Sequence, residues 1–116
     1  MLIISNKQLQ VFDDYLLRQF AAKTARQLVE KLPLDRDPED PEFVEEVLMI
    51  VKNAQSHYFI ESKNGLVEFV FNYYEFAALR QAEQYPGLMN LLRNPRLQEV
   101  LKLEQLLFRL KTNSVS

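Results

Sequence analysis

One histidine and a few neighbouring carboxylates are the residues of this chain whose types could support chemistry. His57 is the sole histidine in the sequence, which leaves a metal site or a catalytic triad without its usual second ligand or base partner. It lies where a helix is predicted to end, and a histidine in the last turn of a helix typically interacts with the helix dipole. We therefore interpret His57 as a structural residue.

Two carboxylate pairs, Asp13–Asp14 and Glu45–Glu46, are formed by adjacent residues. Adjacent residues diverge by about 100° around a helix, so neither pair has the facing arrangement that acid–base catalysis needs. The two glycines are isolated and form no phosphate-binding loop, and the absence of cysteine excludes thiolate metal sites. The sequence therefore predicts a protein that is not an enzyme and binds neither a metal nor a cofactor.

The stretch from Asp35 to Glu46 is strongly acidic. It holds seven carboxylates and one cation, Arg36, which gives it a formal charge of −6. A calcium loop needs carboxylates at alternating positions around a glycine, and this stretch has no glycine. We interpret it as a solvated linker over about residues 33–40 followed by the start of a helix. An acidic docking edge for a basic partner is the functional alternative.

Composition indicates one globular domain. The chain has 116 residues, 47% hydrophobic and 26% charged, with a formal charge of −2, so we predict a single helical domain over residues 1–116. Its start lacks a basic segment followed by a long apolar run, and no stretch approaches the roughly 18 apolar residues of a membrane span. The cations after Pro86 are dispersed without interleaved aromatic residues. We expect a cytoplasmic protein that binds neither membrane nor nucleic acid.

The elements expected to position these residues are all helices. Only two glycines occur and no interior segment alternates cleanly between apolar and polar residues, so a sheet is not predicted. Helix-start signals occur at Ser5 with Gln8, at Asp40 before Pro41, at Ser62, and at Asn94 before Pro95. The predicted helices span residues 6–32, about 41–56, 62–84, a short 88–93 and 95–111, with a frayed tail at about 112–116. The expected fold class is an all-α, compact antiparallel bundle of four main helices and one short helix.

Apolar residues at helical spacing mark the faces of these helices. In the second helix the buried side is predicted to hold Phe43, Val47, Ile50, Val51 and Ala54. In the last helix one side carries Leu97, Val100, Leu101, Glu104, Leu107 and Phe108, and the band is widened by Leu103, Leu106 and Leu110. The last helix therefore has a wide apolar band.

The stretch from Leu66 to Leu79, LVEFVFNYYEFAAL, is the strongest candidate for a binding surface. One apolar stripe comprises Leu66, Phe69, Val70, Tyr73 and Ala77, and a second comprises Val67, Phe71, Tyr74 and Ala78, while Glu68, Asn72 and Glu75 are expected to stay on the polar side. Two apolar stripes present more apolar surface than the neighbouring helices of a small bundle can cover. Tyrosine suits positions where one end of the side chain stays in contact with water. We predict a partner-binding surface at Val67, Phe71, Tyr74, Ala78 and Tyr85.

Three segments carry a resemblance to a known family. The first, KQLQVFDDYLLRQFAAKTARQLVEKLP, has a Gln-Leu, two phenylalanines and a leucine before the terminal proline. The second, NAQSHYFIESKNGLVEFVF, has an Ala-x-x-x-Tyr-x-Ile break before an aromatic-rich helix, and the third is YPGLMNLLRNP. Together they resemble small helical proteins encoded beside type VI secretion effector genes in Gram-negative bacteria. The family usually has glycine where this chain has Phe59, which predicts a differently shaped turn.

The resemblance implies a non-enzymatic accessory role, in which an adaptor or co-chaperone holds a type VI secretion effector or spike component before secretion. Apolar binding of this kind is expected to tolerate salt. Two alternatives stay open. An immunity protein would neutralise a cognate toxin through the acidic edge, and its binding would weaken with ionic strength. A homodimeric helical scaffold would use the aromatic surface for self-association.

Overall fold

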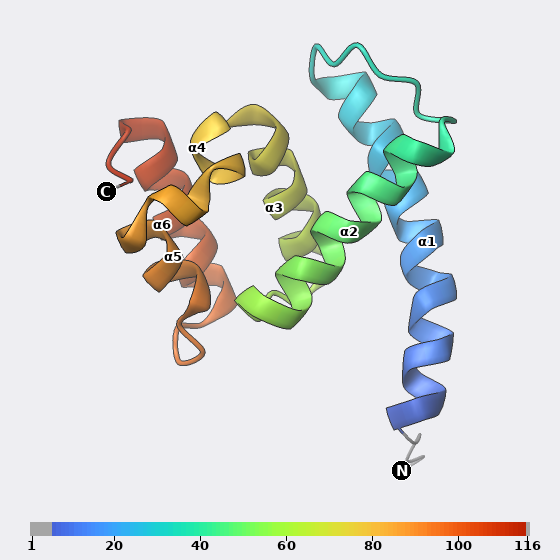
Figure 1. Cartoon of the computed structure of the whole chain (residues 1–116), viewed down its shortest axis with the longest axis horizontal. Helices are drawn as coiled ribbons and strands as arrows, with labels where there is room; N and C mark the ends of the chain where they lie inside the picture. The colour runs from blue at the N-terminus through green and yellow to red at the C-terminus, as the bar shows by residue number, and fades with distance from the viewer. Residues whose placement is uncertain (1–5, 116) are drawn as a thin grey trace. The chain divides into compact units, whose positions relative to one another are not determined.

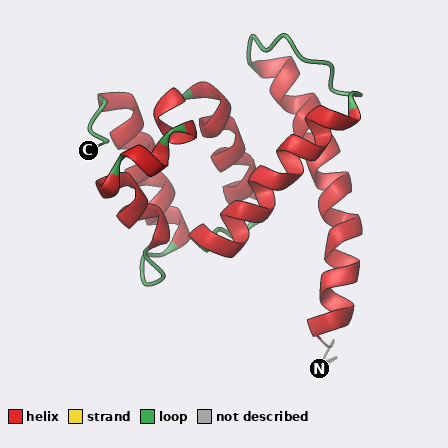
Figure 2. Cartoon of the chain, in the orientation of Figure 1, coloured by secondary structure: helices red, strands yellow, loops and turns green. Residues whose placement is uncertain are grey.

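Figure 1 shows a computed structural model of the chain, which describes the backbone of residues 6–115 and the side chains of residues 14–115. Within this range the regular elements are helices, joined by turns and loops (Figure 2). They are α1 (Asn6–Lys31), α2 (Pro41–Tyr58), α3 (Lys63–Glu75), α4 (Ala77–Arg80), the 3₁₀ turn η1 (Ala82–Gln84), α5 (Pro86–Arg93) and α6 (Glu99–Thr112). The predicted all-α fold class is confirmed.

The described residues fall into two compact units that divide within α2, between Met49 and Ile50. The N-terminal unit contains α1, the linker and the start of α2, and the C-terminal unit contains the end of α2 and the elements after it. The prediction of one helical domain stays a prediction. The start signal predicted at Ser5 and Gln8 lies outside the residues whose side chains are described.

In the N-terminal unit, α1 and the segment that starts α2 run in opposite directions. Arg18 pairs with Glu45 at 2.8 Å, whereas Arg26, further along α1, pairs at 3.3 Å with Glu39, which lies earlier in the chain. Both pairs are solvent-exposed, so each stabilises the unit by less than about 1 kcal/mol. Among the residues of this unit whose side chains are described, the buried ones are Ala21, Thr24, Ala25, Leu28, Phe43, Val47 and Leu48.

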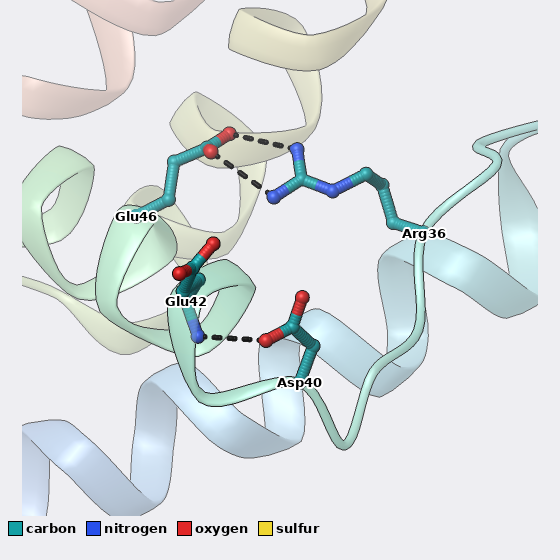
Figure 3. Close-up of polar contacts among 4 residues, drawn as sticks. All are labelled: Arg36, Asp40, Glu42 and Glu46. Carbon is teal, nitrogen blue, oxygen red and sulfur yellow. Dashed lines mark hydrogen bonds and ion pairs between the residues drawn. The ribbon is translucent and has the colours of Figure 1, made fainter.

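The start of α2 is capped as predicted. Oδ1 of Asp40 accepts a hydrogen bond from the backbone N–H of Glu42 at 3.0 Å, and α2 begins at the residue after Asp40 (Figure 3). Arg36 in the linker donates two hydrogen bonds to the carboxylate of Glu46, at 3.1 and 3.3 Å. Its guanidinium carbon also lies 4.4 Å from the centre of the Phe43 ring. The one cation of the acidic run therefore fastens the linker to α2.

Two predictions about buried residues have opposite outcomes. The side of α2 predicted to be buried is confirmed, since each of its five apolar residues is buried: Phe43, Val47, Ile50, Val51 and Ala54. Asn72 of α3, predicted to stay on a polar face, is 4% exposed. Its Nδ2 atom is buried and has no hydrogen-bond partner among the described residues. The polar side chain therefore lies inside the core at a cost in stability.

α3 is shorter than predicted, because it ends at Glu75 instead of continuing to residue 84. The next residue, Phe76, has an extended backbone, with φ −118° and ψ 115°, which interrupts the helix. Arg80 of α4 turns back and donates hydrogen bonds from Nη1 to two carbonyl oxygens in the last turn of α3, at 2.8 and 2.9 Å. Those carbonyls have no helical N–H to accept from, so Arg80 caps the shortened helix.

α5 and α6 are antiparallel, whereas α3 and α6 run in the same direction (Figure 1). Arg109, near the end of α6, donates from Nη1 to the carbonyl oxygen of Gly87 at the start of α5, at 3.2 Å. By contrast Glu99, the first residue of α6, contacts Ser62, which precedes α3. The α3–α6 pair departs from the predicted antiparallel order because α4, η1 and α5 return the chain to the starting end of α3.

The start of α6 and the tail after it differ from the prediction. The side chain of Asn94 was expected to cap a helix from Pro95, but its Oδ1 accepts from the N–H of Arg96 at 3.0 Å and closes a turn, so α6 begins only at Glu99. At the other end the backbone of Asn113 is left-handed, with φ 58°, which closes the helix. Val115 follows and is buried, so the described part of the tail carries a core residue.

Replacing Asp40 with Ala is expected to lower the free energy of unfolding by about 1 kcal/mol, because the N–H of Glu42 loses its acceptor. Urea unfolding followed by far-UV circular dichroism measures the change. Asp35→Ala is the matched control, since it removes one charge from the same acidic run without removing the cap. Equal losses in the two variants would contradict the capping role.

Candidate functional site

A carboxylate from α6 lies at the start of α3. Glu99 accepts hydrogen bonds from the backbone N–H groups of Glu61 and Ser62, at 2.6 and 3.0 Å, and from the hydroxyl of Ser62. The same hydroxyl oxygen accepts from the N–H of Gly65 at 2.9 Å, which makes Ser62 the predicted N-cap of α3. In a capping box the carboxylate comes from the third residue of the same helix. Here that residue is Gly65, and Glu99 of another helix supplies the carboxylate.

Gly65 provides the space that this arrangement needs. A Cβ atom built at Gly65 would lie 2.6 Å from Oε2 of Glu99 and 2.9 Å from Oγ of Ser62. Both distances are shorter than real contacts of a Cβ atom. Any larger residue would therefore displace the Glu99 carboxylate from the start of α3.

The environment of Glu99 favours its charged form. Burial raises the pKa of the Glu99 carboxyl, but hydrogen bonds from Ser62 and Glu61 and the charge of Lys102 outweigh burial and lower that pKa below its ordinary value. The first turn of a helix also carries a partial positive charge, which attracts a carboxylate. Glu99 is therefore an ionic cap for α3.

Lys102, in the same turn of α6, caps the end of α2. Its side chain is 0% exposed, and its Nζ donates to the carbonyl oxygen of Tyr58, the last residue of α2, at 2.6 Å. Nζ also lies 5.3 Å from the centre of the Phe59 ring. Burial lowers the pKa of Lys102 below its ordinary value, while the charge of Glu99 opposes the fall. A cation suits this place because the end of a helix carries a partial negative charge.

The loop between α2 and α3 turns at Phe59, whose φ is 58°. This left-handed conformation is one that glycine commonly adopts at helix ends, and here Phe59 adopts it. The conformation costs a residue with a Cβ atom roughly 1 kcal/mol or more. The N–H of Ile60 then donates to the carbonyl oxygen of Ala54 at 3.2 Å, and the side chain of Ile60 is fully buried.

These contacts set which side of α6 faces the core. The buried residues of the helix are Lys102, Leu103, Leu106 and Leu110. Exposed apolar side chains lie on the opposite side: Val100 is 65% exposed, Leu101 46% and Phe108 66%. At 100° per residue, each set covers about 100° of the helix circumference. Of the apolar residues predicted along one side, Val100, Leu101 and Phe108 are exposed, whereas Leu97 and Leu107 are half-buried. The three leucines predicted to widen the band are buried in the core.

We call Val100, Leu101, Glu104 and Phe108 the outer face of α6. Grooves flank it on both sides. The groove toward α3 is lined by Glu68, Glu99 and Glu104 among others, and no cationic side chain lines it. The groove toward α5 is lined by amides and a guanidinium, from Asn90, Asn94, Gln105 and Arg109. The outer face therefore lies between an anionic groove and a groove rich in hydrogen-bond donors.

The five residues predicted to bind a partner are half-buried and lie in the C-terminal unit. Val67, Phe71 and Tyr74 belong to α3, Ala78 to α4, and Tyr85 precedes α5. The break at Phe76 separates Ala78 from the α3 stripe, so the structure does not bring the five together as one continuous helix face. Their role as a binding surface stays a prediction. Sequence reasoning did not identify the outer face of α6 as a candidate surface. The only signal for it was that the apolar band of this helix is wider than one buried side.

The other chemical candidates lie apart from one another. His57 is exposed in the last turn of α2, and Lys102 takes the last carbonyl of that helix. Glu45 and Glu46 diverge as predicted, because Glu45 pairs with Arg18 while Glu46 pairs with Arg36. Asp13 lies outside the residues whose side chains are described. Among the described residues, no group of three or more histidine or acidic side chains is arranged to hold a metal ion.

Within the described residues, no helix has the length and apolar character needed to cross a membrane. Comparison of the chain with protein-family models, curated proteins and solved structures found no match. The resemblance to accessory proteins of type VI secretion is therefore an expectation from the sequence.

Glu99→Gln is expected to lower the free energy of unfolding by about 1 to 2 kcal/mol at pH 7, because the capping contacts lose a charged acceptor. The pKa of Glu99 is lower in the folded than in the unfolded chain, so its contribution exists above the unfolded value and is lost as pH falls through the folded value. The difference between wild type and variant should therefore shrink in acid. Denaturant unfolding at several pH values, with Glu104→Gln as control, measures it. A difference independent of pH would contradict the ionic cap.

Gly65→Ala is expected to destabilise the wild-type chain, because the added Cβ atom displaces the Glu99 carboxylate. In a Glu99→Ala background the same change should be less destabilising, because only the contact with Oγ of Ser62 then remains. A double-mutant cycle of urea unfolding measures this coupling between the two positions. The same effect of Gly65→Ala in both backgrounds would show that Gly65 is not needed to make room for the Glu99 carboxylate.

Proposed function

We propose that this chain is a non-enzymatic accessory protein that binds another protein through the outer face of α6. The single observation that carries the proposal is the exposure of Val100, Leu101 and Phe108 on one side of a helix whose opposite side is fully packed. Large apolar side chains that cluster at a surface are typical of protein–protein contacts, where aromatic residues often act as anchors. Phe108 is the expected anchor.

The finer proposal is that the partner is a type VI secretion effector or spike component, for which the chain acts as an adaptor or co-chaperone in the cytoplasm. Its support is the sequence resemblance described above. The apolar character of the outer face agrees with the salt-tolerant binding expected of such an adaptor.

The alternative of an immunity protein with an acidic edge receives less support. Three carboxylates of that edge, Glu39, Glu45 and Glu46, already pair with arginines of the same unit. Asp40 is engaged in capping α2. The free charge available to a basic toxin is therefore smaller than the formal charge of the run. A homodimer through α6 is the other alternative, and the experiment below separates it.

Substituting both Leu101 and Phe108 with Ser is expected to abolish partner recovery while changing stability by only about 0.5 kcal/mol per site, because both side chains are exposed. Tagged wild-type and variant chains are used for pull-downs at low and high salt from a host lysate, and mass spectrometry identifies the bound proteins. Phe71→Ser with Tyr74→Ser is the matched pair on α3.

An effector or spike component that is bound at both salts and lost only with the α6 pair would support the proposal. Loss only with the α3 pair, in a variant that urea unfolding shows to be folded, would move the site to the surface predicted from the sequence. Recovery of a toxin that dissociates at high salt would favour the immunity role. If wild type retains only itself, as a dimer by light scattering, the accessory role is overturned.

A further inference from the structure

A carboxylate interrupts the apolar row on α6. Leu101, Glu104, Phe108 and Lys111 are spaced by three, four and three residues, the spacing that aligns side chains along one contact seam between helices. Glu104 lies in this row between the two large apolar residues, one turn from each. A helix that docks across Leu101 and Phe108 therefore also covers Glu104.

Within the described part of the chain, the side chain of Glu104 makes no hydrogen bond or ion pair, and neither does that of Glu68 across the adjoining groove. Glu99, the third carboxylate of this groove, is engaged by Ser62 and Glu61. Covering Glu104 with an apolar surface would remove water from a charge without replacing it, which strongly opposes binding. A partner that covers the row must therefore bring a cation to this position.

A two-fold contact between the α6 helices of two copies does not supply that cation. In a parallel two-fold pair of α6 helices, Glu104 would face Glu104 of the other copy. An antiparallel pair that matched Glu104 with Lys111 of the other copy would set Leu101 opposite residue 114, beyond the end of α6 at Thr112. The apolar row would then lose one of its two large residues from the contact. Charge complementarity thus favours a different protein.

We propose that the outer face of α6 docks an amphipathic helix of another protein whose apolar stripe carries one lysine or arginine opposite Glu104. The apolar residues of that helix cover Leu101 and Phe108, and its cation is shared between Glu104 and the anionic groove that Glu68 lines. The cation fixes the register of the docked helix, because a shift by one turn would leave Glu104 against an apolar residue. This inference rests on the proposed protein-binding function and names the chemistry of the partner.

The test uses two synthetic helical peptides of about 18 residues, a length at which helices become stable in water. Both carry the same leucine stripe, and the central stripe position holds lysine in one and glutamate in the other. Titration of each into the ¹⁵N-labelled full chain, followed by NMR, gives the affinity and the amides that shift. Wild type is expected to bind the lysine peptide about tenfold tighter, with shifts centred on residues 100–108 and a preference that declines with salt.

Glu104→Lys is expected to reverse the preference, whereas Glu83→Lys, an exposed change on η1, should leave it intact. Equal affinities for the two peptides, shifts centred elsewhere, or concentration-dependent α6 shifts without peptide would overturn the inference. If the pull-down above still recovers a partner that depends on Leu101 and Phe108, the proposed function survives that failure. If the chain prefers the lysine peptide but the pull-down recovers no partner, the inference about the docking surface stands and the proposed accessory role is rejected.

Discussion

The fold of the C-terminal unit depends on one turn of α6 that serves two other helices at once. Glu99 binds the free N–H groups before α3, and Lys102 binds the last carbonyl of α2. Each charge matches the helix end that it contacts, and the two side chains, three residues apart, also attract each other. The short loop between α2 and α3 has a left-handed Phe59 at its centre, and this conformation costs energy. Glu99 and Lys102, together with the backbone hydrogen bond from Ile60 to Ala54, hold the loop in place.

This constraint connects the packing to the proposed activity. With Glu99 and Lys102 turned inward, the rotation of α6 about its axis is fixed, and Val100, Leu101, Glu104 and Phe108 must point outward. A helix held by apolar contacts alone could bury either side of its wide apolar band. Two charged caps select which side is buried. The other side stays exposed, and it is the surface for which we propose a partner.

Local signals account for the features that the sequence predicted well. Asp40 before Pro41 and the serine at position 62 start helices as expected, since an N-cap needs only its own neighbours. The contact between Glu99 and Ser62 joins residues 37 apart, so no local pattern shows it. α3 ends before Phe76, where the sequence has neither proline nor glycine, so no helix-breaking residue marks this end. The outer face of α6 could not be predicted for a related reason. Apolar spacing alone does not indicate which side of a helix packs against the core.

Amide hydrogen exchange at Glu61 and Ser62 tests the central claim most directly. Both N–H groups lie before α3, and each donates to Glu99. The account predicts that both amides are protected at neutral pH in wild type and exchange at the rate of free peptide in Glu99→Ala, while the amides at the centre of α3 stay protected. Unprotected amides in wild type, or protection that survives Glu99→Ala, would show that α6 does not hold the start of α3.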